Sequence, residues 1–438
     1  MRRLFMYRFS KKSLRKEVLR YEKPVVNFDV GEKAWLIATI IYFSVFLLFF
    51  LGPIKCASRK GPLKERKPLL ILFSEGAISS MLKAAQLAAS QPLAESNHDF
   101  LKRLAEVLVA LGSQLCSLYG READVSKPAT FAMYLQALLA LTRHPSPSLN
   151  VTATSLWLAL LRHERISTDP DLMAILEPWV NVAAEKLIKV GYPSRNDHAA
   201  CAYSRLDFES DDEFSPVMQR LRVDLLDALR SATLISPEVT YNCVQNWLQS
   251  QLTKPVSGEL CTASSPTFLE WEALTAMLDC VVGVVSRTFL KQKDANAAKA
   301  LPAGGLQLLD RCLVYDSPDP LIASVLLSCI SAMFVFVHQD TSRLQPVLRK
   351  VLTAMVFTLP GQTKESRSRT VRNVRRHACS LMVKISRQFP TLLLPAFDYL
   401  KSSIEELSQT HEAAQLSRME RVTLQEALLL ISNQVPVY

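Results

Sequence analysis

The sequence predicts an all-α protein made of stacked, antiparallel helix pairs. From about Ser74 onward, apolar residues recur at steps of three and four, which is the spacing of an α-helix with one buried face. Glycine is scarce, with 12 residues in a chain of 438, whereas average proteins contain about 7%. No segment alternates apolar and polar residues for long enough to require a β-strand.

Successive apolar stripes each predict one helix. The first stripe contains Phe100, Leu104, Val107, Leu108, Leu111, Leu115 and Leu118. Further stripes predict helices over residues 127–143, 153–165, 170–190, 214–234, 237–252, 266–291, 318–338, 343–358, 370–389, 391–408 and 411–432. Longer breaks are predicted at 192–213, 253–264, 293–304 and 359–368.

Several helix starts are marked by proline. The pairs are Asp169-Pro170, Ser236-Pro237, Ser265-Pro266 and Asp319-Pro320. In each pair an oxygen-bearing side chain can cap the first turn, and a proline at the first helical position sacrifices no intrahelical hydrogen bond.

The helix starts group into pairs about every 40 residues, which is the period of HEAT-type solenoids. We therefore predict a HEAT-type helical-repeat solenoid, a right-handed superhelix of antiparallel helix pairs. A single helical bundle is disfavoured because about a dozen helices would have to share one core larger than domains usually build.

Basic residues are concentrated near the amino terminus. The formal net charge is +10, and residues 1–67 hold sixteen Lys and Arg against five Asp and Glu. The remaining chain holds 35 against 36 and has a net charge of −1. Only a local basic cluster can therefore argue for an anionic partner.

Residues 1–58 form a separate segment. Its stretch 34–54 carries no charge and is long enough to cross a bilayer as a helix. No small-residue cleavage site of a signal peptide follows it. Two interpretations stay open: a transmembrane helix, or sequence foreign to the fold such as mistranslated flanking sequence, which we favour.

Catalytic and metal-binding patterns are missing from the sequence. Nine cysteines are scattered without Cys-x-x-Cys spacing, as in reduced proteins of the cytosol or nucleus. His163 has no second histidine four residues on, and no phosphate-binding loop occurs. Since these motifs are missing, we predict no cofactor and no metal site. We also predict that the chain is not an enzyme, because solenoids usually bind macromolecules on an extended surface.

Residues 204–214 form an acidic run, which we predict to be a solvated loop. An EF-hand is excluded because the sixth position from Asp207 is Asp212 instead of glycine. Ser210 is followed by three acidic residues and is a candidate phosphorylation site.

The segment 367–389 combines an apolar stripe with an arginine cluster. On a helix of 100° per residue, the apolar residues occupy a sector of about 100°. The arginines that lie nearly opposite are Arg369, Arg372, Arg376 and Arg387, with Arg375 at the border of the apolar stripe.

Between Lys364 and Lys384 the only acidic residue is Glu365, so ion pairs within the helix are almost unavailable. Arginine offers bidentate donors to phosphate, and an array of arginines gains affinity by releasing counterions. We therefore predict that these five arginines bind phosphate. An acidic protein partner and a plain solvated face are the alternatives.

Six stretches of the sequence resemble the exportin-five family of karyopherins. They are RKGPLKERKPLLILF (59–73), FLKRLAEVLVALGSQLCSLYG (100–120), LWLALLRHE (156–164), VGYPSRNDHAACAYSRLDFESDDEF (190–214), RTVRNVRRHACS (369–380) and EALLLISNQ (426–434). The resemblance covers residues 59–438 and corresponds to a central portion of the family proteins.

The resemblance implies a nuclear export receptor that binds double-stranded RNA, such as microRNA precursors, on a basic concave surface. It implies GTP-bound Ran and nuclear pore proteins as partners, and shuttling between nucleus and cytoplasm. Arg369, Arg372, Arg375 and Arg376 match the family's arginine-rich helix by position. The family's amino-terminal arch, which supplies most Ran contacts, has no counterpart in this sequence.

Two other functions remain open at this level. If residues 34–54 span a bilayer, the chain is a membrane-tethered helical scaffold that binds acidic proteins. Alternatively, the solenoid is an export adaptor for proteins alone, in which the arginines meet an acidic partner.

Overall fold

The computed structural model describes residues 67–90, 93–255, 259–288, 297–409 and 415–434. The apolar stretch 34–54 lies outside these residues. Its two interpretations, a transmembrane helix or sequence foreign to the fold, therefore stay predictions. Within the described ranges the structure is helical, and an isolated bridge between Tyr119 and Glu122 is the only β-type pairing.

The described α-helices follow one another closely along the chain. Their bounds are α3 (Glu75–Ser90), α4 (Glu95–Leu118), α5 (Phe131–Arg143), α6 (Pro147–Arg162), α7 (Pro170–Lys186), α8 (Ala199–Asp207), α9 (Asp211–Ile235), α10 (Pro237–Thr253), α11 (Pro266–Thr288), α12 (Ala297–Val314), α13 (Pro320–Met333), α14 (Leu344–Met355), α15 (Arg369–Gln388), α16 (Pro390–Leu393), α17 (Phe397–Gln409) and α18 (Arg418–Ser432).

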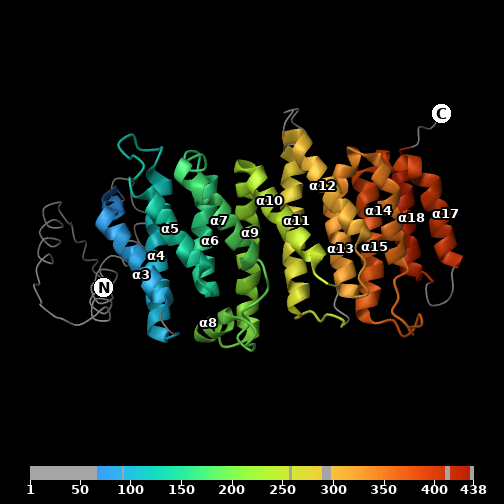
Figure 1. Ribbon diagram of the computed structural model, residues 1–438, viewed down its shortest axis with the longest axis horizontal. Coiled ribbons are helices and arrows are strands. Elements are labelled where there is room, and N and C mark those ends of the chain that lie inside the picture. Colours follow the sequence, from blue (N-terminus) through green and yellow to red (C-terminus); the bar gives the residue numbers. More distant parts are fainter. Residues whose placement is uncertain (1–66, 91–92, 256–258, 289–296, 410–414, 435–438) are drawn as a thin grey trace, which may run out of the picture. The chain divides into compact units, whose positions relative to one another are not determined.

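The long helices alternate between two layers. In one layer α4, α6, α9, α11, α13, α15 and α18 each pack against the next member of the series. In the other layer the series is α3, α5, α7, α10, α12, α14 and α17. Neighbouring helices lie side by side in chain order (Figure 1). This arrangement confirms the predicted array of HEAT-type helix pairs.

The core lies between the two layers and is mainly aliphatic. Trp157 of α6 and Trp179 of α7 are fully buried there, with their ring centroids 5.5 Å apart. The indole N–H of Trp157 donates a hydrogen bond to Thr142 Oγ1 at 2.9 Å. The polar end of Trp157 is therefore satisfied inside the core, whereas the buried indole N–H of Trp179 has no hydrogen-bond partner among the described residues.

The proline-marked helix starts are largely as predicted. The carboxylates of Asp169 and Asp319 accept hydrogen bonds from backbone N–H groups in the first turns of α7 and α13. Helix α10 also begins at Pro237, but the side chain of Ser236 makes no capping hydrogen bond. For Ser236 the proline alone marks the start.

Helix α12 contradicts the predicted break 293–304 over residues 297–304, the part of the break that the structure describes. Pro302, Gly304 and Gly305 disfavour a helix locally, yet α12 runs through all three. A Cβ atom on Gly305 would lie 2.4 Å from the ring of buried Phe336. Glycine at 305 thus permits a close approach that stabilises the helix, and tertiary packing overrides the local preference.

One described stretch, Pro320–His338, is long and apolar enough to cross a membrane. It comprises α13 and the 3₁₀ helix Phe334–His338. Its mean hydropathy is 2.4, and 67% of it is buried inside the fold. Such burial is typical of a core helix.

His144 makes the folding stability depend on pH. Burial, aided by the charges of His98 and Lys186, lowers the pKa of His144 to about 4. In the unfolded chain this imidazole takes up a proton below about pH 6.5. Its contribution to stability is therefore full above pH 6.5 and is lost as the pH falls toward 4.

We expect the free energy of unfolding to fall between pH 7 and pH 4.5, and to fall less steeply in His144→Asn. The asparagine oxygen can replace His144 Nδ1, which accepts a hydrogen bond from the Ser146 N–H at 3.1 Å. Urea denaturation across this pH range measures the effect. Equal pH dependence in both proteins would contradict it.

Candidate nucleic-acid interface

Helix α15 begins where Ser368 caps it, since the Ser368 hydroxyl accepts a hydrogen bond from the Val371 N–H. Its apolar face packs against α13, α14 and α18. The buried residues of this face are Val371, Val374, Ala378, Leu381, Met382 and Ile385. The predicted apolar sector is therefore buried, and the buried face also includes Arg375, Cys379, Val383 and Ser386.

Arg369, Arg372 and Arg376 are exposed on the opposite side of α15. We call these three residues the arginine ridge. The Arg376 guanidinium donates to Asn373 Oδ1 at 2.9 Å and to the Arg372 carbonyl at 3.4 Å. Among the described residues, no carboxylate lies within ion-pair distance of the ridge. The described contacts therefore use few of the N–H donors of these side chains.

Arg375 is not part of this exposed surface, which corrects its predicted role as a phosphate contact. Its side chain is fully buried. The guanidinium pairs with Glu420 of α18, with Nε 3.2 Å from Oε1, and donates to the Gln415 carbonyl at 3.0 Å. The carboxylate comes from 45 residues away, so a helical wheel of one segment could not reveal it.

The carboxylate of Glu420 is held ionised at this junction. Burial alone would raise its pKa, but hydrogen bonds from Arg375 and Ser417 lower the pKa below the ordinary value. Arg367 is also nearly buried, and its guanidinium donates to the same Gln415 carbonyl at 3.0 Å. Two of the clustered arginines therefore fasten the segment before α18 to α15.

Arg387 is exposed as predicted, but it has an acidic partner. Its guanidinium lies 2.9 Å from Glu426 Oε1 on α18. Lys384 reaches Asp279 of α11 at 3.9 Å. Such exposed pairs contribute little to stability, yet they reduce the charge available at the carboxyl-terminal end of α15. The uncompensated charge is concentrated at its amino-terminal end.

The sequence did not indicate the surroundings of His377. Its Nδ1 lies 2.8 Å from Ser324 Oγ and its Nε2 lies 3.4 Å from Ser328 Oγ, both on α13. Burial lowers the pKa of His377, so the ring stays neutral near pH 7. The hydroxyls on α13 therefore engage His377, which adds no positive charge to the surface of α15.

The acidic run 204–214 is mostly helical, which corrects the predicted loop. Asp207 ends α8, and Asp211 begins α9. The Asp207 carboxylate lies 2.8 Å from both His98 Nε2 and Lys102 Nζ. Burial opposes its charge, but hydrogen bonds from His98, Lys102 and Ser148 lower the pKa of Asp207. Partners distant in sequence thus neutralise a side chain that looked solvated.

Ser210 caps α9, because its hydroxyl accepts a hydrogen bond from the Glu213 N–H. Asp211, Asp212 and Glu213 occupy the first turn, where carboxylates interact favourably with the helix dipole. The acidic residues therefore have a structural reason to be there. Phosphorylation of Ser210 stays a prediction.

Two kinds of reactive site are relevant to the described residues, a metal site and an activated thiol. No group of three or more His, Cys, Asp or Glu side chains there could hold a metal ion. Burial raises the pKa of the Cys116 and Cys329 thiols to about 12. Both thiols are therefore protonated and poorly nucleophilic at neutral pH.

Comparison with known proteins gives a consistent set of relatives. The model of the Exportin-5 family matches residues 95–438. Exportin-5 of Homo sapiens is 38% identical over 407 residues, which cover 89% of this chain and 33% of the human protein. Exportin-5 of Mus musculus is 38% identical over 432 residues, covering 94% of this chain and 35% of the mouse protein.

The chain thus spans about a third of the length of these curated relatives. Among solved structures, the crystal structure of Kap121p aligns with 92% of this chain and 44% of its own, with 12% sequence identity and a TM-score of 0.27. The family match and the identity over most of the chain agree with the resemblance found in the sequence: the chain belongs to the Exportin-5 family.

Proposed function

We propose that this chain is part of a nuclear export receptor and that its arginine ridge binds the phosphates of duplex RNA. One observation carries the proposal. Three exposed arginines follow one another on adjacent turns of α15, without a carboxylate within ion-pair distance among the described residues.

Unpaired arginines on adjacent turns repel each other, and a polyanion relieves this repulsion. Each guanidinium can donate two parallel hydrogen bonds to one phosphate. The exposed side of α15 carries no aromatic residue, so stacking on bases is not available there. Contacts to the backbone of an A-form duplex, whose bases are hard to reach, fit this surface best.

The proposed site is narrower than the set predicted from the sequence. It comprises Arg369, Arg372 and Arg376, while Arg387 takes part only if RNA displaces Glu426. Arg375 has a positioning role, because it holds α18 against α15. The concave position of the ridge remains a prediction.

Family membership supports further proposals for the whole receptor. They are a non-enzymatic role, binding of GTP-bound Ran and of nuclear pore proteins, microRNA precursors as cargo, and shuttling between nucleus and cytoplasm.

Charge reversal at the ridge tests the proposal. In Arg372→Glu/Arg376→Glu we expect weaker binding of a duplex RNA with a 3′ overhang, for every duplex sequence tried. The slope of log Kd against the logarithm of the salt concentration should decrease by up to about 1.8, which is about 0.9 for each of two lost phosphate contacts. Fluorescence anisotropy at several salt concentrations measures both quantities.

The matched control is Arg103→Glu/Arg220→Glu, which changes the charge equally. Arg103 and Arg220 are exposed but already pair with Glu106 and Asp224. The control should bind duplex RNA almost as the unmodified chain does. Unchanged RNA affinity and unchanged salt slope in the ridge variant would exclude RNA binding at the ridge. Binding of polyglutamate that duplex RNA does not displace would favour an acidic protein partner.

A further inference from the structure

A surface pocket of about 690 Å³ lies far along the array from the arginine ridge. It is formed by the carboxyl-terminal ends of α6 and α9, by Ser167 and Thr168 of the loop after α6, and by the first turn of α7. Along their layer, α11 and α13 separate α9 from α15. The pocket is therefore distinct from the proposed RNA site and is independent of it.

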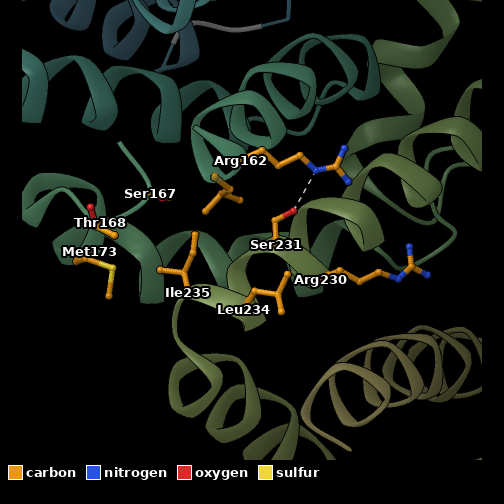
Figure 2. Close-up of a pocket in the computed structure, with 9 residues that line it drawn as sticks. Arg162, Ser167, Thr168, Met173, Arg230, Ser231, Leu234 and Ile235 are labelled. Atoms are coloured by element: carbon orange, nitrogen blue, oxygen red, sulfur yellow. Dashed lines mark hydrogen bonds between the residues drawn. The ribbon is translucent and has the colours of Figure 1, made fainter. Parts of the chain in front are cut away.

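One wall of the pocket is aliphatic. Leu161 is buried and Ile235 is half-buried, whereas Met173 and Leu234 are exposed. Leu234 is 54% exposed, although it belongs to the well-packed end of α9. Figure 2 shows Met173, Leu234 and Ile235 grouped on one side of the pocket. This wall can take an aliphatic side chain and remove it from water.

The other side of the pocket is positively charged. Figure 2 shows the side chains of Arg162 and Arg230 extending in the same direction, away from Met173 and Ile235. Asp227 is shared between them, 3.9 Å from Arg162 Nη2 and in contact with Arg230 Nη1. Two guanidiniums thus face one carboxylate, which leaves a net positive charge.

The guanidiniums also retain hydrogen-bond donors. Arg162 uses its Nε to donate to Ser231 Oγ at 3.2 Å, which fixes the direction of the side chain. Arginine has five N–H donors, and the contacts described use few of them. A carboxylate placed beside Asp227 would find donors from both arginines at the mouth of an aliphatic pocket.

We propose that this pocket binds a short protein segment in which an aliphatic side chain is followed closely by a carboxylate. The aliphatic side chain would lie against Leu234 and Met173, and the carboxylate would bridge Arg162 and Arg230. Charge complementarity selects the acidic residue, and burial of the exposed aliphatic wall supplies the attraction.

Nucleic acid is a poor match for the same pocket. Phosphate would satisfy the arginines but would leave the aliphatic wall in contact with water. The residues that line the pocket include no aromatic ring on which a base could stack. The combination of aliphatic and cationic walls therefore favours a peptide.

Peptide display on the full chain tests the proposal. A library of random twelve-residue peptides is selected on the immobilised 438-residue chain, and enriched peptides are measured by fluorescence anisotropy. We expect them to share an aliphatic residue followed within a few positions by Asp or Glu. We also expect affinity to fall about tenfold or more in Arg230→Ala/Leu234→Asp, and when the acidic residue of the peptide becomes an amide.

The matched control is Arg220→Ala/Val223→Asp on the same helix. Val223 is 54% exposed, as Leu234 is, and Arg220 also pairs with an aspartate. This control should keep peptide affinity, and duplex RNA binding should be unchanged in both variants. The proposal is overturned if no enriched peptide distinguishes the two variants, or if the selected peptides lack acidic residues. It is also overturned if the chain self-associates and the pocket variant abolishes this, because the occupant would then be a second copy of the chain.

Discussion

Replacing Arg375 with methionine is expected to destabilise the junction between α15 and α18 by about 3–5 kcal/mol, the usual effect of removing one partner from a buried ion pair. Arg375 is fully buried and Glu420 nearly so. Without the guanidinium, the Glu420 carboxylate would be left in the interior without its ionic partner. Urea denaturation followed by circular dichroism measures the loss.

Two variants test whether the loss of stability comes from the buried ion pair or from the removal of any arginine on α15. Arg376→Met changes the next residue, which is exposed, and should alter stability by less than about 0.5 kcal/mol. Arg375→Met/Glu420→Gln removes both charges, while glutamine can still accept the N–H of Ser417 that Glu420 now accepts. The double variant should be more stable than Arg375→Met. Equal loss in Arg375→Met and Arg376→Met would show that the buried pair is unimportant.

Substituting Gly112 with alanine is expected to destabilise the chain by about 2–4 kcal/mol, although alanine is the better helix former. A Cβ atom at this position of α4 would lie 2.2 Å from Tyr134 Oη and 2.7 Å from Leu156. Tyr134 is fully buried, and its hydroxyl donates to the Leu108 carbonyl at 2.6 Å. The methyl group would overpack the contact and displace this hydrogen bond.

Gly283 provides the control, because it also lies inside a long helix, α11. The nearest atom to a Cβ there would be the end of the Arg287 side chain at 3.7 Å. Gly283→Ala should therefore be neutral or should stabilise by up to about 1 kcal/mol. The prediction for Gly112 fails if both alanine variants change the denaturation midpoint in the same direction.

The helical fold was predictable because it follows from local rules. The spacing of apolar residues predicted most helices. A proline preceded by an oxygen-bearing residue predicted the starts of α7 and α13. Helix α12 could not be predicted in this way. There Phe336 packs closely against Gly305, a contact between residues 31 positions apart that leaves no periodic signal in the sequence.

The candidate site was predictable only in part for the same reason. A helical wheel correctly separates the buried face of α15 from Arg369, Arg372 and Arg376. It gives no information about neighbouring helices, so it could not reveal that Glu420 neutralises Arg375 or that Glu426 pairs with Arg387. The carboxylates that determine which arginines stay available belong to α18.

The position of the Arg375–Glu420 pair also determines how cooperatively the array unfolds. In a stack where each pair of helices contacts mainly its neighbours, stability is a sum of local contributions and of contributions from each junction. This ion pair belongs to the junction between α14–α15 and α17–α18. Weakening it is therefore expected to loosen the coupling between α14–α15 and α17–α18, so that the two pairs of helices unfold less cooperatively.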